Sequence, residues 1–109
     1  MPKKIDKETI NELYKLFATI DKPEDFELLF EDLCTFKEIE QMAGRIAAAK
    51  LFLEGKTYVQ VMEETSISSA TLSRVSRCVQ HGEGYRKILS EQKKKKKFGL
   101  SLWLKEEDI

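Results

Sequence analysis

Residues 56–78 have the sequence KTYVQVMEETSISSATLSRVSRC, which decides the fold because it predicts two short helices joined by a tight turn. Thr57 stands three residues before Gln60, which is the spacing of a capping box at the start of the first helix. Ser68 is placed to cap the second helix. Apolar side chains recur at the spacing that packs one helix across the other, at Val61, Ile67, Leu72 and Val75. The segment therefore predicts a helix-turn-helix over about residues 57–78.

The second predicted helix leaves one face free of large side chains. A helix that carries short polar residues and two guanidinium groups is typical of a protein that reads DNA through the major groove. We expect base-edge and nearby contacts from Ser68, Ser69, Ala70, Thr71, Ser73, Arg74 and Arg77. We expect Lys56 and Thr57, at the start of the first helix, to hold a backbone phosphate. The alternative is an ordinary helical hairpin with no role on DNA.

Two positions depart from the usual helix-turn-helix pattern. The fifth position, counted from Tyr58, usually carries a small residue so that the helices approach closely, and here it is Met62. The ninth, in the turn, is usually glycine, and here it is Ser66. Because methionine is flexible enough to fill irregular gaps, the pattern still predicts the paired helices.

Length and composition predict one all-helical domain. The chain has 109 residues, 41% hydrophobic residues, five glycines and two prolines. It has no apolar run long enough for a bilayer and no signal peptide, so we expect no membrane contact. Cys34 and Cys78 indicate no disulfide framework, so we expect the reducing cytoplasm. The pair Cys78 and His81 lacks the second cluster that a metal site needs. With one histidine and no Gly-rich phosphate loop, we expect no enzyme activity and no cofactor.

Charge is unevenly distributed along this neutral chain. Residues 1–55 hold eight Lys or Arg and twelve Asp or Glu, whereas residues 56–97 hold ten and four. The last twelve residues hold one and three. The basic excess begins at the predicted helix-turn-helix, as a DNA-facing half requires. Half of these ten cations form the run Lys93–Lys97, which is either a solvated segment or a phosphate clamp.

The remaining periodicity predicts four further helices around this pair. Their expected ranges are about Lys7–Ile20, Pro23–Leu33, a long helix that follows Thr35 and ends near Leu53, and Tyr85–Glu91. The first three carry more large apolar residues than so small a core needs. We therefore expect burial against a second copy, and a two-fold protein suits a two-fold DNA site. The alternative is a monomer with a well-filled core.

Several motifs resemble the Trp repressor superfamily, in particular the small Trp-repressor-like proteins of Gram-positive bacteria. They are CTFKEIEQMAGR at residues 34–45, EGKTY at 54–58, SSATLSRVSR at 68–77 and CVQHGEGY at 78–85. The resemblance covers about residues 8–91. It implies an intertwined, all-helical homodimer and a repressor that binds a two-fold operator. It thus makes residues 1–91 a dimerisation and DNA-binding domain, followed by a Lys-rich run and tail at 92–109.

The resemblance also implies where a small ligand would bind. In the tryptophan-responsive members, two arginines and a threonine contact the corepressor, and these positions match Arg45, Arg74 and Thr35 here. The family has a glycine beside the indole ring where this chain has Val75, and a serine where it has Cys78. A β-branched side chain in the space of the ring is a steric objection to tryptophan. The resemblance therefore predicts another small effector, or none, while Arg45 and Arg74 can alternatively form salt bridges.

Two features leave alternatives open. In the tail Phe98–Ile109, apolar residues alternate as in a strand, so the tail either packs on a partner or is a frayed terminus. The short side chains at Ser69, Ala70 and Ser73 are equally compatible with a helical protein-interaction module. Such a module would retain the helix-turn-helix fold without specific DNA binding.

Overall fold

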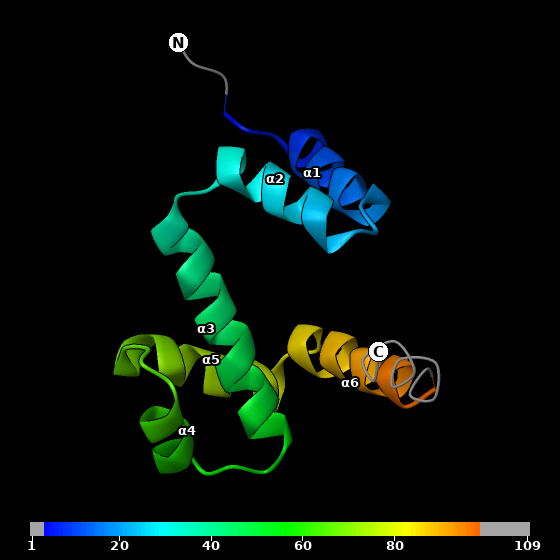
Figure 1. Ribbon diagram of the computed structural model, residues 1–109. Coiled ribbons are helices and arrows are strands. Elements are labelled where there is room, and N and C mark those ends of the chain that lie inside the picture. The colour runs from blue at the N-terminus through cyan, green and yellow to red at the C-terminus, as the bar shows by residue number, and fades with distance from the viewer. Residues whose placement is uncertain (1–3, 99–109) are drawn as a thin grey trace. The chain divides into compact units, whose positions relative to one another are not determined.

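The computed structural model describes the backbone of residues 4–98 and the side chains of residues 4–92. Over this range it contains six α-helices and no strand, which confirms the all-helical prediction (Figure 1). The helices are α1 (Lys7–Thr19), α2 (Pro23–Leu33), α3 (Phe36–Leu53), α4 (Tyr58–Glu64), α5 (Ser69–His81) and α6 (Gly84–Phe98). They form two compact units, residues 1–39 and 40–109, which divide within α3.

Local side-chain caps begin α1, α3, α4 and α5, whereas α2 begins at Pro23 without one. At α1, the carboxylate of Asp6 accepts a hydrogen bond from the backbone N–H of Thr9 at 2.9 Å. At α3, the Thr35 hydroxyl accepts from the backbone N–H of Glu38, and the Glu38 carboxylate accepts from the N–H of Thr35. These hydrogen bonds lower the pKa of both Asp6 and Glu38 below the ordinary value for their side chains. Both caps therefore weaken as these carboxylates become protonated in acid.

The first unit has little core of its own. Its aromatic side chains Phe17, Phe26 and Phe30 lie with ring centroids 5.6–6.0 Å apart, which is the range of favourable aromatic contact. No residue of α1 or α2 is fully buried. Large apolar side chains on these helices are 40–64% exposed, namely Ile10, Leu13, Leu16, Leu28 and Leu33. The apolar surplus predicted from the sequence is thus unburied in the single chain.

The second unit contains the buried core. Its fully buried residues come from α3, α4 and α5, and they are Ala48, Ala49, Val61, Leu72, Val75 and Val79. Gly44 lets α3 lie close to the turn after α4, because a Cβ at this position would come within 2.8 Å of Cγ2 of Ile67. Gly55 follows the end of α3 with a φ of 94°, a conformation that favours glycine. Close packing at small residues therefore holds α3 against the helix-turn-helix.

Helix α6 is longer than the sequence pattern predicted. We expected a helix over Tyr85–Glu91, but α6 continues through the run Lys93–Lys97 to Phe98. Lysine is a good helix former, and no glycine or proline interrupts the chain between Tyr85 and Phe98. Helix propensity thus extends the segment beyond its apolar pattern. Apart from Phe98, the predicted strand-like tail lies outside the described residues.

Among the helices that the structure describes, none combines the length and the apolar character needed to cross a membrane.

Replacing Gly44 with alanine tests the close approach of α3 to Ile67. We expect Gly44→Ala to lower the free energy of unfolding by about 1–2 kcal/mol, because overpacking outweighs the gain in helix propensity. Urea denaturation followed by circular dichroism measures this change. Gly84→Ala is the matched control, since nothing lies within 4 Å of a Cβ built there. Equal stability of the two variants would contradict the packing assigned to Gly44.

Candidate nucleic-acid interface

The helix-turn-helix consists of α4 and α5 packed through a small buried seam. Val61 of α4 and Leu72 and Val75 of α5 are at most 1% exposed, whereas Ile67 of the turn is half-buried. Met62 is 42% exposed and so does not crowd the approach of the two helices. The predicted apolar spacing is confirmed, and the unusual methionine has room at the surface.

Tyr58 adds a polar clamp that the sequence pattern did not reveal. Its hydroxyl donates to the backbone carbonyl of Ser69 at 3.3 Å and lies 3.1 Å from Oγ of Ser73. The side chain also packs its ring against Phe52, with centroids 6.3 Å apart. Tyr58 thus ties the first turn of α4 to the first two turns of α5. Only the assembled fold brings together residues that stand 11 and 15 positions apart.

The outer face of α5 carries the side chains that the sequence predicts for DNA contact. Ser69, Ala70, Ser73, Arg74 and Arg77 are all exposed. Ser68 caps α5, and its oxygen accepts from the backbone N–H of Thr71 at 3.2 Å. Thr71 itself is half-buried and lines the cavity described below. Its position is therefore less open than that of the other predicted contacts.

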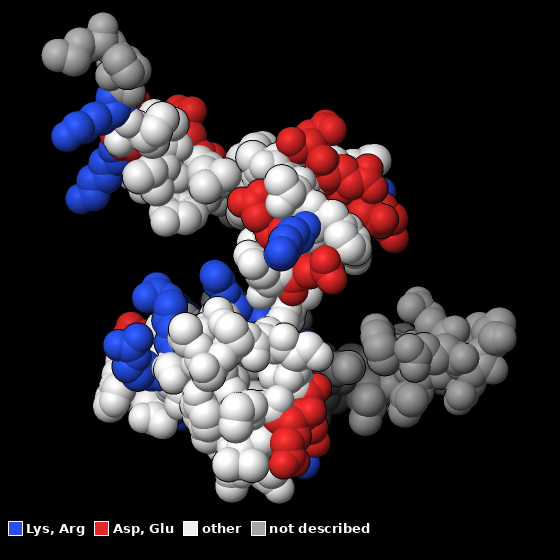
Figure 2. All heavy atoms as spheres, turned by 90° about the vertical axis from the view of Figure 1, so that its left-hand side faces the viewer, with Lys and Arg blue, Asp and Glu red and all other residues white. Residues whose placement is uncertain are grey.

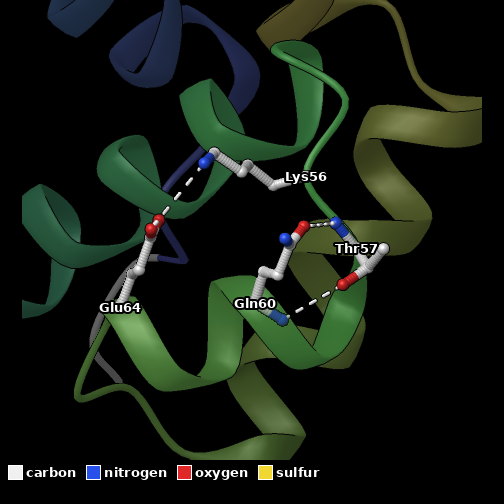
Figure 3. Close-up of polar contacts among 4 residues, drawn as sticks. All are labelled: Lys56, Thr57, Gln60 and Glu64. Carbon is white, nitrogen blue, oxygen red and sulfur yellow. Dashed lines mark hydrogen bonds and ion pairs between the residues drawn. The ribbon is translucent and has the colours of Figure 1, made fainter.

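Lys56 and Thr57 lie at the start of α4, as expected, and each makes an intramolecular contact (Figure 3). The Thr57 hydroxyl accepts from the N–H of Gln60 at 3.2 Å, and the Gln60 side chain accepts from the N–H of Thr57 at 2.9 Å. The predicted capping box is confirmed. The ammonium of Lys56 lies 3.9 Å from a carboxylate oxygen of Glu64, at the other end of the helix.

Charge is unevenly distributed on one face of the second unit. On the face shown in Figure 2, Lys and Arg side chains lie on one side of this unit, and a separate group of Asp and Glu side chains lies on the other. The side chains of the Lys93–Lys97 run are outside the described set. On this face, a duplex would meet favourable charge on the basic side and unfavourable charge on the acidic side.

A cavity of about 550 Å³ lies between α3, α5 and α6. Its size falls within the roughly 300–1,000 Å³ of small-molecule sites. Arg45 of α3 and Arg74 of α5 both line it, so the fold brings together the two arginines singled out in the sequence. Val75 and Cys78 line it as well. The cavity therefore combines apolar walls with two guanidinium groups that suit an anion.

Thr35, the third residue implied for ligand contact, is not among the lining residues. Its hydroxyl and its backbone N–H are both used in the capping box that begins α3. A ligand contact from Thr35 stays a prediction.

Arg86 is a second residue whose role the sequence did not indicate. Its guanidinium donates to the backbone carbonyl of Val79 at 2.8 Å. This carbonyl belongs to the last turn of α5, where intrahelical partners run out, and a cation there is favourable for the helix dipole. Arg86 thus fixes the C-terminal end of α5 from the first turn of α6.

Among the described residues, no group of three or more His, Cys, Asp or Glu side chains is placed to hold a metal ion.

Comparison with known proteins places the chain in a family. The model of the Trp repressor protein family matches residues 8–93. The uncharacterised YerC protein of Bacillus subtilis is 43% identical over 81 residues, which are 72% of this chain and 78% of YerC.

Two crystal structures have the same fold. A candidate Trp repressor from Staphylococcus aureus is 34% identical with a TM-score of 0.75, over 81% of this chain and 89% of that chain. A TrpR-like protein from Eubacterium eligens is 30% identical with a TM-score of 0.73, over 79% and 90% of the two chains. The family match, the relative and the shared fold agree with the paired helices α4 and α5, and the chain belongs to the Trp repressor family.

Proposed function

We propose that this protein is a sequence-specific DNA-binding regulator of transcription, which acts as a repressor on a two-fold operator. The observation that carries the proposal is the exposed face of α5, held outward by the α4–α5 seam. Its side chains are short or end in guanidinium groups, so the helix can enter the major groove closely. Membership of the Trp repressor family supports the same role.

A homodimer would bury the exposed apolar side chains of the first unit and would provide two copies of α5 for DNA. Several large apolar side chains of α1 and α2 are exposed in the single chain, and a concentration of exposed apolar residues is typical of an interface. Phe36, at the start of α3, is 76% exposed. A second copy would bury this surface and supply a second α5. Two such helices, about one DNA turn apart, would fit the two halves of a palindromic operator.

We assign different roles to the cations at this surface. Arg77, and Arg74 where it is not used by a ligand, would donate two hydrogen bonds to guanine in the major groove. Lys56 and Thr57 would contact a phosphate, which adds affinity without sequence preference. Ser68, Ser69, Ala70, Thr71 and Ser73 would permit close approach, with many contacts through water.

The cavity beside α5 suits a small effector with an acidic group and an apolar body. Arg45 and Arg74 would bind the anion, and the apolar walls would take the body. Val75 is one of the residues that line the cavity. An indole ring beside Arg74 would require the Val75 side chain to move, so we do not expect tryptophan to be the effector. Because Arg74 belongs to both the cavity and the exposed face of α5, an effector there would change the DNA-facing surface.

A protein-interaction module is the second candidate. The tie between Ser73 and Tyr58 favours it, because a hydroxyl held by the fold is less available to a base. Binding to duplex DNA that is weak, abolished by salt and without sequence preference would support this alternative.

Two alanine variants test the division of roles on DNA. We expect Arg77→Ala to weaken binding to the best-bound genomic fragment about 5- to 150-fold, with little effect on random duplex, because guanine contacts carry the preference. We expect Lys56→Ala to weaken both equally and to reduce the salt slope, by at most about one. Fluorescence anisotropy over a salt series measures both effects.

Lys15→Ala is the control for these variants, since it removes one exposed positive charge from α1, which is not part of the proposed DNA surface. Equal losses on the specific and the random duplex for both Arg77→Ala and Lys56→Ala would refute the proposed roles.

The mass of the protein in solution tests whether two copies of the chain associate. We expect light scattering after size exclusion to give the mass of a dimer. Leu13→Glu should shift the mass toward the monomer, because it places a charge on the apolar face of α1. Val59→Glu adds the same charge at an exposed apolar residue of α4 and should remain dimeric. A monomeric wild-type protein would exclude the proposed dimer.

A further inference from the structure

One ion pair is found among the described side chains, and it lies at the proposed DNA surface. Nζ of Lys56 is 3.9 Å from Oε1 of Glu64, and the two side chains are 40% and 47% exposed. Lys56 precedes α4, whereas Glu64 is its last residue. The two side chains together therefore span the length of the helix.

The pair directs the lysine away from the threonine with which it would share a phosphate. In Figure 3 the ammonium of Lys56 points toward Glu64, and the hydroxyl of Thr57 points in another direction. That hydroxyl accepts from Gln60, so its own proton stays available to an acceptor. While the ion pair persists, the Lys56 ammonium and the Thr57 hydroxyl therefore do not point toward one common phosphate.

The ion pair contributes little to the stability of the fold. Exposed pairs of this kind are weak, because water screens both charges and two long side chains must be ordered. A carboxylate and a phosphate offer the same ammonium the same kind of negatively charged oxygen. Exchange of one anion for the other is therefore feasible when a duplex approaches.

Positive charge is scarce at this surface, so the pairing matters for binding. Among residues 56–81, the cations other than histidine are Lys56, Arg74 and Arg77, and the anions are Glu63 and Glu64. The ion pair neutralises one of three cations. From this juxtaposition we propose that Glu64 competes with the DNA phosphate for Lys56 and so limits the sequence-independent affinity of the protein. This inference rests on the DNA binding proposed above.

The competition has a distinct signature in the salt dependence. When Lys56 binds a phosphate, condensed counterions leave the DNA, but the released Glu64 carboxylate attracts cations in turn. The net release at this contact is smaller than for an unpaired lysine. Removal of the carboxylate should therefore tighten binding and also steepen the salt slope, by up to about 0.9.

Glu64→Gln tests the proposal on a random-sequence duplex, again by anisotropy over a salt series. We expect the Kd to fall about two- to five-fold at low salt, which corresponds to the worth of an exposed ion pair. Glu63→Gln is the matched control, because it removes the same charge from the neighbouring residue of α4, which forms no described ion pair. Glu63→Gln should lower the Kd clearly less than Glu64→Gln does.

Repeating both changes in a Lys56→Met background completes the double-mutant cycle. There Glu64→Gln should act no more strongly than Glu63→Gln, and circular dichroism should show that every variant is folded. The competition would be overturned, while DNA binding stands, by equal effects of the two glutamine variants when Lys56 is present. An undiminished Glu64→Gln effect in the Lys56→Met background would overturn it as well. Absence of duplex binding by wild type and all variants would refute the proposed function and this inference together.

Discussion

The packing of α4 across α5 is the contact on which the rest of the molecule depends. Val61, Leu72 and Val75 are removed from solvent at this seam, and the Tyr58 hydroxyl joins the same two helices by polar contacts. Because the inner face of α5 is fully used in this way, its outer face consists of the short and charged side chains left over. The Arg86 contact then fixes the other end of α5. The buried seam thus determines which side chains α5 exposes on its outer face.

The cavity adjoins the outer face of α5, which is the proposed DNA surface. Arg74 lines the cavity and is also exposed on α5, while Val75, one residue on, is part of the core. A ligand in the cavity would therefore act on residues at or next to those proposed to touch DNA. This proximity gives an effector a short physical route to the proposed function, without movement through a distant network.

Local rules predicted much of this structure. The caps at Asp6, Thr35, Thr57 and Ser68 depend on residues three positions apart, so the sequence specifies them directly. The buried seam follows from apolar spacing within two short helices. The predicted length of α6 was wrong, because apolar periodicity ends near Glu91 whereas helix propensity continues through the lysines.

Contacts between distant positions were not predictable in the same way. Tyr58 meets Ser73, Gly44 meets Ile67 and Arg86 meets Val79 only because the helices cross. The Lys56 and Glu64 pair spans eight residues, beyond the three or four at which helix neighbours are expected. For the candidate site, the sequence indicated which residues lie on the outer face. It did not indicate which of these residues make contacts within the protein, as Ser73 and Lys56 do.

Selection of bound fragments from sheared bacterial genomic DNA, with and without L-tryptophan, tests the central claim most directly. Our account predicts a palindromic motif that is enriched equally in both arms, because we propose that two copies of α5 read the DNA and that Val75 excludes an indole ring. Enrichment only with tryptophan would contradict the role of Val75. No motif in either arm would contradict sequence-specific DNA binding itself and favour the protein-interaction module.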